Sequence, residues 1–188
     1  MSSANARLPR VLFLLTAVCT SIYFSYYYPL LPKVVASHFD VHGIANGWQT
    51  KQGFFEVLAG TTALSAFLIF GIPTMIGIIP VQFINLPNKD YWLAPEQRAA
   101  SLEFLSGWFA WFGYAVYLVI ILAFDYAMQM NLHSASGPNP ARLWYTLAGL
   151  AVFTVIWTIR LFSRFGRLRR TPDREGGEAR AMRERFRG

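Results

Sequence analysis

Two histidines, His38 and His42, flank Asp40 in the run His-Phe-Asp-Val-His. Histidine and aspartate are common metal ligands, and on a helix two residues four positions apart would share one face and reach one ion. The run lacks the additional glutamate or histidine of a zinc hydrolase motif. Two other interpretations stay open: histidines that bond backbone groups in a loop packed on the protein, and a sensor of protonation near neutral pH.

Glu56 and Asp125 are the ionisable residues that lie closest to long apolar runs. Charge inside a bilayer is costly and often marks a pairing or functional site. We expect both carboxylates at a depth similar to that of the histidines, which predicts a polar cluster of His38, His42, Glu56 and Asp125. The alternative is a pair of carboxylates at the membrane surface, where the cost of charge is small.

The chain that must position these residues is strongly apolar, with 54% hydrophobic and 14% charged residues, against roughly 25% charged in soluble domains. A span needs about 20 mostly apolar residues. We predict an all-α, integral-membrane bundle of four transmembrane helices with a polar outer loop and a basic C-terminal tail. The expected spans are about residues 11–31, 54–76, 104–128 and 143–162, within a transmembrane domain of residues 1–163 that precedes a tail of residues 164–188.

Proline, glycine and asparagine residues mark where the predicted spans begin and end. Pro73 and Pro80 should kink or end the second apolar run, because proline lacks the backbone donor that a helix needs. Pro95 suits the first turn of the helix that leads into the third span. The segment Asn131–Pro140 is rich in turn-forming residues and is predicted to be a turn.

The net charge of +7 is concentrated at the end of the chain. Ten arginines and four acidic residues follow Thr158, so this part carries +6 of the total. Lys and Arg accumulate on the cytoplasmic flanks of spans, which predicts cytoplasmic N- and C-termini and an outer loop on the opposite side. The bilayer explains the basic balance more simply than nucleic acid does, and we expect the tail to contact anionic lipid.

The outer loop resembles the signature of a bacterial and archaeal membrane domain of unknown function, whose best-known relatives are the Sdp-type toxin-immunity and signalling membrane proteins. The residues that carry the resemblance are Leu31, Pro32, His38, Phe39, Gly43, Gly47, Trp48 and Lys51. The resemblance implies a plasma-membrane protein of a prokaryote with an outward-facing recognition loop. All of the residues just named except Leu31 are then expected to contribute to binding. His42 and Asn46 depart from the pattern, and the immunity proteins have additional spans.

The sequence contains no glycine-rich phosphate loop, no serine elbow and no paired CxxC motifs. We therefore expect no catalytic residues, no metal and no cofactor. The expected protein is non-enzymatic and has a binding, sensing or immunity-type role through the loop of residues 32–52, with the lipid bilayer and a peptide or another membrane protein as partners. The alternatives are an accessory subunit of a membrane complex or transporter, and a metal-dependent membrane enzyme that uses His38 and His42.

Overall fold

The structure is a computed structural model that describes residues 4–76, 78–133 and 137–166 of the 188-residue chain. Within these ranges, four helices are long and apolar enough to cross a membrane, which confirms the predicted four-helix class. The candidate spans are Arg7–Leu30, Lys51–Met75, Pro95–Leu132 and Ala141–Gly166. Residues 167–188 lie outside the described ranges, so the predicted basic tail and its lipid contact stay predictions.

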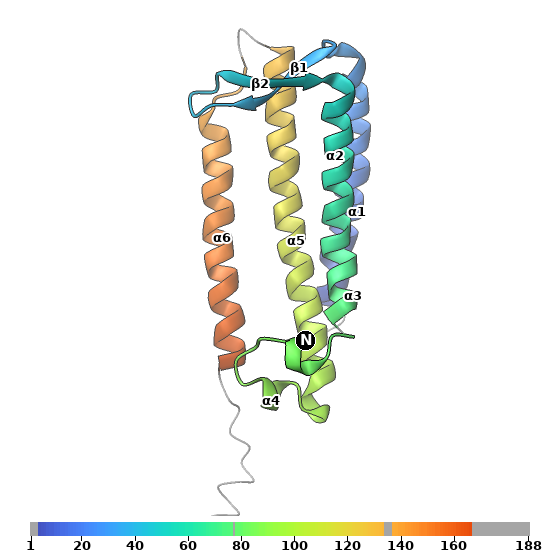
Figure 1. The fold of residues 1–188 in the computed structure, drawn as a ribbon, viewed down its shortest axis with the longest axis vertical. Coiled ribbons are helices and arrows are strands. Elements are labelled where there is room, and N and C mark those ends of the chain that lie inside the picture. The colour runs from blue at the N-terminus through green and yellow to red at the C-terminus, as the bar shows by residue number, and fades with distance from the viewer. Residues whose placement is uncertain (1–3, 77, 134–136, 167–188) are drawn as a thin grey trace, which may run out of the picture.

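The spans correspond to the long helical elements of Figure 1. The first is α1 (Ala4–Tyr27), which a short 3-10 turn, η1 (Tyr28–Leu30), extends. The third is α5 (Pro95–Leu132) and the fourth is α6 (Ala141–Gly166). Because α5 continues to Leu132, the turn expected from Asn131 begins later than the sequence predicts, and Asn131 belongs to the helix.

The second span changes its helical type along its length. The α-helix α2 (Lys51–Ala66) passes into a π-helical segment, η2 (Phe67–Gly71), and then into α3 (Ile72–Ile76). The Ile72 N–H reaches back to the Phe67 carbonyl, a spacing of five residues. Pro73 follows directly, and because proline lacks an N–H it cannot continue the regular bonding pattern. The predicted distortion near Pro73 is therefore present as a wider helical turn.

The stretch predicted to be a polar outer loop forms a β-hairpin. The strands β1 (Val34–Phe39) and β2 (Ala45–Thr50) pair antiparallel, with register shifts near His38. Figure 1 shows this hairpin lying across one end of the bundle, above α5 and towards α6. We call this the hairpin end. Side chains of β2 alternate between half-buried and exposed, as expected for a strand with one face on the protein.

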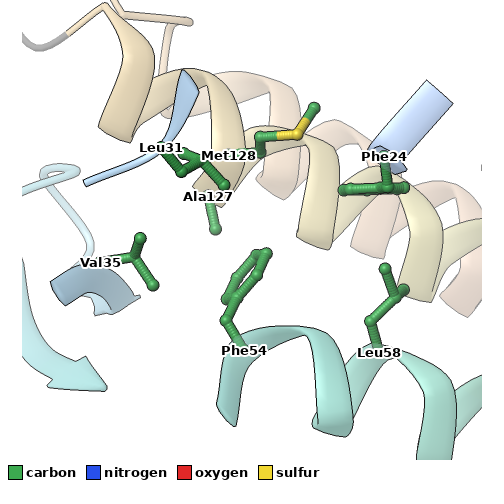
Figure 2. Close-up of a cluster of buried hydrophobic side chains, with 7 residues drawn as sticks. All are labelled: Phe24, Leu31, Val35, Phe54, Leu58, Ala127 and Met128. Carbon is green, nitrogen blue, oxygen red and sulfur yellow. The ribbon is translucent and has the colours of Figure 1, made fainter. Parts of the chain in front are cut away.

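A cluster of buried apolar side chains lies directly beneath the hairpin (Figure 2). It brings together α1, the chain leading to β1, β1 itself, α2 and α5. Its members are Phe24, Leu31, Val35, Phe54, Leu58, Ala127 and Met128. Val35 is 1% exposed, so one face of the hairpin is part of the apolar core rather than a loop resting on it.

The opposite end of the bundle is closed by the connector between the second and third spans. It contains the 3-10 turn η3 (Val81–Phe83) and the short helix α4 (Lys89–Trp92). The Asn88 side chain and the Trp92 indole donate hydrogen bonds to the Phe165 carbonyl, at 3.0 and 2.9 Å. The last carbonyls of a helix lack intrahelical donors, so the connector caps α6. We call this the connector end, and the start of α1 lies near it in Figure 1.

The fourth span packs less closely than the others. Figure 1 shows α6 beside α5 and apart from α1 and α2. The Trp157 and Trp108 rings stack with centroids 6.0 Å apart, and the Trp157 indole donates to the Trp108 carbonyl at 3.1 Å. Phe165 is the buried residue of α6 among those described. Most of the α6 surface is therefore exposed, as suits a helix that faces a lipid bilayer.

Candidate functional site

The hairpin turn is organised by Asp40. One carboxylate oxygen of Asp40 accepts hydrogen bonds from the backbone N–H groups of His42 and Ile44, at 2.9 and 2.8 Å. The Gly43 N–H donates to the Asp40 carbonyl at 3.0 Å. This arrangement is a type I turn followed by a left-handed residue, which is typical of a three-residue hairpin loop. Asp40 therefore holds the turn together, in addition to standing between the two histidines.

Gly43 is required by both its conformation and its surroundings. Its φ of 80° lies in the left-handed region that glycine adopts at little cost. A Cβ added at this position would lie 2.6 Å from Cγ of Pro140 and 2.9 Å from the hydroxyl oxygen of Tyr126. The turn therefore sits tightly against α5 and against the residue that precedes α6.

Asn131 fixes the first strand to the third span. Its side-chain carbonyl accepts a hydrogen bond from the Ala36 N–H, and its side-chain amide donates to the Ala36 carbonyl, both at 2.8 Å. One asparagine thus supplies the donor and the acceptor that a neighbouring strand would supply. No local feature of the sequence indicated this role, because asparagine near the end of an apolar run also predicts a turn.

Lys51 ties the second strand back to the first span. Its ammonium group donates to the carbonyl oxygens of Tyr28 and Leu31, each at 3.2 Å, and lies 4.5 Å from the centre of the Tyr28 ring. Cations are favoured at helix C-termini, where carbonyls lack partners. Thr50 caps the start of α2 by accepting from the Gly53 N–H at 3.0 Å. The lysine of the predicted binding set therefore stabilises the junction of α1 and α2.

Some of the other predicted binding residues support the fold, and others have exposed side chains. The Phe39 ring packs edge-on against Tyr126, with centroids 5.6 Å apart. Gly47 lies opposite His38, where an added Cβ would be 3.0 Å from the His38 Cβ. Pro32 is exposed directly after the buried Leu31. Of the predicted binding set, Pro32, His38 and Trp48 are exposed.

The two histidines do not share the face of a helix. His38 lies in β1 and His42 lies in the turn, and both are exposed. The His38 Nδ1 atom is 3.1 Å from the Ser37 hydroxyl. Among the described residues, no group of three or more His, Cys, Asp or Glu side chains is arranged to hold a metal ion. The helical geometry considered for this pair is wrong, because a hairpin separates the two residues into a strand and its turn.

Asp125 and Glu56 have partners other than those of the predicted cluster. Asp125 accepts from the Tyr23 hydroxyl at 2.7 Å and forms an ion pair with Arg142 at 3.1 Å. Gln129 also donates to the Tyr23 hydroxyl, at 2.9 Å. Asp125 therefore links α1, α5 and α6 near the hairpin end.

Glu56 accepts a hydrogen bond from Gln52, one turn earlier on the same helix, at 2.8 Å. No interaction between described residues joins Glu56 to Asp125 or to either histidine. The structure thus brings together Tyr23, Asp125, Gln129 and Arg142 instead of the expected four residues. Tyr23 and Arg142 were missed because their meeting depends on how three separate helices pack.

Four large apolar side chains of the hairpin remain exposed, and we call them the hairpin apolar set. They are Val34 at 57%, Val41 at 60%, Ile44 at 64% and Trp48 at 62%. Sequence reasoning singled out Trp48 alone. Val34 lies in β1, and Val41 and Ile44 lie in the turn. Prolines, glycines and histidines favoured reading the whole stretch as a loop.

The fold and this site define a multi-pass membrane protein with a hairpin fixed across one end of its helices. Residues 15–60 match the model of a family described as "Domain of unknown function (DUF1648)". The match covers the later part of α1, the whole hairpin and the start of α2. No curated protein matches the chain. No solved structure matches it either.

Proposed function

We propose that the chain is a non-enzymatic membrane protein that recognises a partner through the outer face of the hairpin. The observation that carries the proposal is the exposure of the hairpin apolar set on a segment bonded firmly to α1 and α5. A rigid support keeps exposed side chains in place and lowers the entropy lost on binding. Sensing, signalling and immunity of the Sdp type are forms that such recognition takes.

The position of the hairpin along the chain favours a partner over lipid tails. The candidate spans end at Leu30 and begin again at Lys51, so the hairpin lies outside both. Apolar surface held in water costs about 25 cal/mol per Å2, and a partner that covers it recovers that free energy. Exposed apolar groups of this kind mark interaction sites more often than scattered single residues do.

The distribution of charge supports an outward-facing hairpin, and the resemblance of the loop to a prokaryotic membrane family supports a place in the plasma membrane of a prokaryote. The described Lys and Arg residues at the connector end are Arg7, Arg10, Lys89, Arg98, Arg160 and Arg164. The hairpin end has Lys33, Lys51 and Arg142. Positive residues favour the cytoplasmic side, so the termini are assigned to the cytoplasm and the hairpin to the outside.

A second candidate function is that of an accessory subunit in a membrane complex, and the surface of α6 favours it. Side chains such as Tyr145, Val152 and Ile159 are 77%, 59% and 61% exposed along this helix. A partner span could cover this surface, as lipid does in its absence. Photo-crosslinking from position 152 tests it: a discrete protein adduct supports the subunit role, and lipid adducts alone contradict it.

The main proposal is tested by site-specific photo-crosslinking in cells. A photoreactive amino acid replaces Trp48 in one variant and Phe83 in a matched control, because Phe83 is also exposed, at 73%, but lies at the connector end. The proposal predicts a discrete adduct from position 48 that is missing from position 83. The same adducts from both positions, or none from position 48, would contradict recognition by the hairpin.

A further inference from the structure

The two strands of the hairpin direct part of their backbone outward, away from each other. The Lys51 N–H donates to the Lys33 carbonyl at 2.9 Å, so this pair is hydrogen-bonded across the strands. Bonded and non-bonded pairs alternate in an antiparallel ladder. The register places Val35 opposite Gln49 and Ala36 opposite Trp48. The N–H and C=O groups of Ala36 and Trp48 therefore point away from the neighbouring strand.

The outer edge of β1 is closed at this point. Asn131 satisfies both the N–H and the C=O of Ala36, each at 2.8 Å. The asparagine also donates to the Ala127 carbonyl of its own helix at 2.7 Å, which holds its amide in place. This edge is therefore occupied by the protein itself.

The outer edge of β2 has no such closure. Within the described parts of the chain, no interaction involves the outward N–H or C=O of Trp48. Proteins commonly protect free edges with charged residues, proline or β-bulges. The strand Ala45–Thr50 contains no charged residue and no proline, and the register shifts of the hairpin fall between Ala36 and Phe39. Its pairing is regular from Trp48 to Thr50, because the register shifts lie nearer the turn.

We propose that the free edge of β2 binds an extended peptide segment by strand addition, with the Trp48 indole as a side-chain anchor. This inference rests on the proposed function and names its class of partner. An extended backbone supplies the alternating donors and acceptors that this edge lacks. Because β2 has no charged side chain, the complementary segment is uncharged and carries apolar side chains beside Trp48 and Ile44.

The size of the edge favours a peptide over a second copy of the chain. A stable protein–protein interface buries roughly 1,200 Å2 or more in total. One strand of six residues offers much less than that. Pairing of β2 with β2 of another copy would need further contacts between helices, whereas peptide recognition by strand addition needs only the backbone and a few side-chain contacts.

The test uses the full chain in nanodiscs and a labelled synthetic peptide of alternating valine and threonine residues. Binding is measured by fluorescence anisotropy for the unchanged protein, Trp48→Ala and Trp48→Pro. Alanine removes the indole but keeps the edge N–H, whereas proline removes both. We expect the Pro variant to bind about tenfold more weakly than the Ala variant, which corresponds to one net hydrogen bond.

A second peptide carries N-methyl groups on the amides that would face the edge, and it is tested on the unchanged protein. It needs no variant, so misfolding of Trp48→Pro cannot obscure the result. We expect about a tenfold or greater loss of affinity for this peptide. Equal binding of the two peptides, or no saturable binding of the unmethylated one, overturns strand addition.

The experiments distinguish a failure of strand addition from a failure of the proposed function. If position 48 gives partner adducts but the two peptides bind equally well, the hairpin recognises a partner in another way than by strand addition. Loss of those adducts would remove the proposed function itself. A β2-to-β2 dimer that the peptide does not dissociate would overturn the assignment of a peptide partner.

Discussion

The two ends of the bundle are closed in different ways. At the connector end, Trp92 turns towards the protein: its ring packs against Phe165 with centroids 5.4 Å apart, and its indole caps α6. At the hairpin end, Trp48 is 62% exposed and Phe39 takes the inward position against Tyr126. Each end thus has an aromatic residue that packs into the fold, but at the hairpin end the Trp48 side chain is also left mostly exposed.

Within the predicted binding set, this difference separates residues that support the fold from residues that are left exposed. Gly43, Phe39 and Lys51 are explained by the turn, the core and the end of α1. Their substitution should harm stability first and binding only as a consequence. Trp48 has no such role, so its substitution should affect binding while leaving stability nearly unchanged.

The largest contrast is expected between the two tryptophans. Trp92→Ala should lower the free energy of unfolding by about 3 kcal/mol, because it removes packing against Phe165 and one of the two side-chain donors to the Phe165 carbonyl. Trp48→Ala should change it by no more than about 0.5 kcal/mol, since the side chain is mostly exposed. Unfolding in detergent, followed by circular dichroism, measures both. Equal losses of unfolding free energy in the two variants would contradict the distinction between the connector end and the hairpin end.

A substitution in the hairpin turn should have the next largest effect. Gly43→Ala places a Cβ 2.6 Å from Pro140 Cγ and holds alanine at φ of 80°, so we expect a loss of about 2–3 kcal/mol. Gly149→Ala is the matched control, because no atom lies within 4 Å of its added Cβ and alanine favours helices. The control should be neutral or slightly stabilising. A neutral Gly43→Ala would show that the turn does not rest on α5.

Loss of the strand anchor should act locally at one end. Asn131→Ala leaves the N–H and C=O of Ala36 without partners, at a cost of about 1–3 kcal/mol. Amide hydrogen exchange should become faster in β1 and β2 and stay unchanged in the connector. Asn88→Ala, which removes one of the two side-chain donors to the Phe165 carbonyl, should produce the reverse pattern. Faster amide exchange at both ends of the bundle in either variant would show that the two ends are not stabilised independently.

The smallest effect is expected at the ion pair near the hairpin end. Asp125→Asn should cost about 0.5–1 kcal/mol, because the Arg142 side chain is 47% exposed and solvent screens the pair. The cost should shrink at high salt. Glu56→Gln is the control and should change stability by less than about 0.5 kcal/mol, since its partner Gln52 lies on the same helix. Equal losses of stability in the Asp125 and Glu56 variants would favour the predicted cluster that contains both carboxylates.

The helices could be predicted from the sequence because their signal is local. An apolar run long enough to span the bilayer satisfies its backbone hydrogen bonds within itself, so length and composition suffice. Pro73 likewise marks the distorted turn of the second span by its own chemistry. The hairpin was missed because the register shift at His38 breaks the alternation of β1, and nearby prolines and glycines favour a loop.

The site was less predictable because its contacts join distant parts of the chain. Asn131 and Ala36 are separated by 95 positions, and Lys51 lies 20 positions from the Leu31 carbonyl that it caps. Asp125 meets Arg142 only because α6 returns beside α5. Residue types indicated that Asp125 and Lys51 matter, but no spacing in the sequence indicated their partners.

The most direct test of the central claim is labelling of single cysteines in intact cells with a membrane-impermeant maleimide. In a Cys19→Ser background, Trp48→Cys reports on the outer face of the hairpin and Phe83→Cys on the connector end. An outward, open hairpin predicts rapid labelling at position 48, and labelling at position 83 only after permeabilisation. Protection of position 48 in both intact and permeabilised cells, or labelling of position 83 in intact cells, would contradict the account.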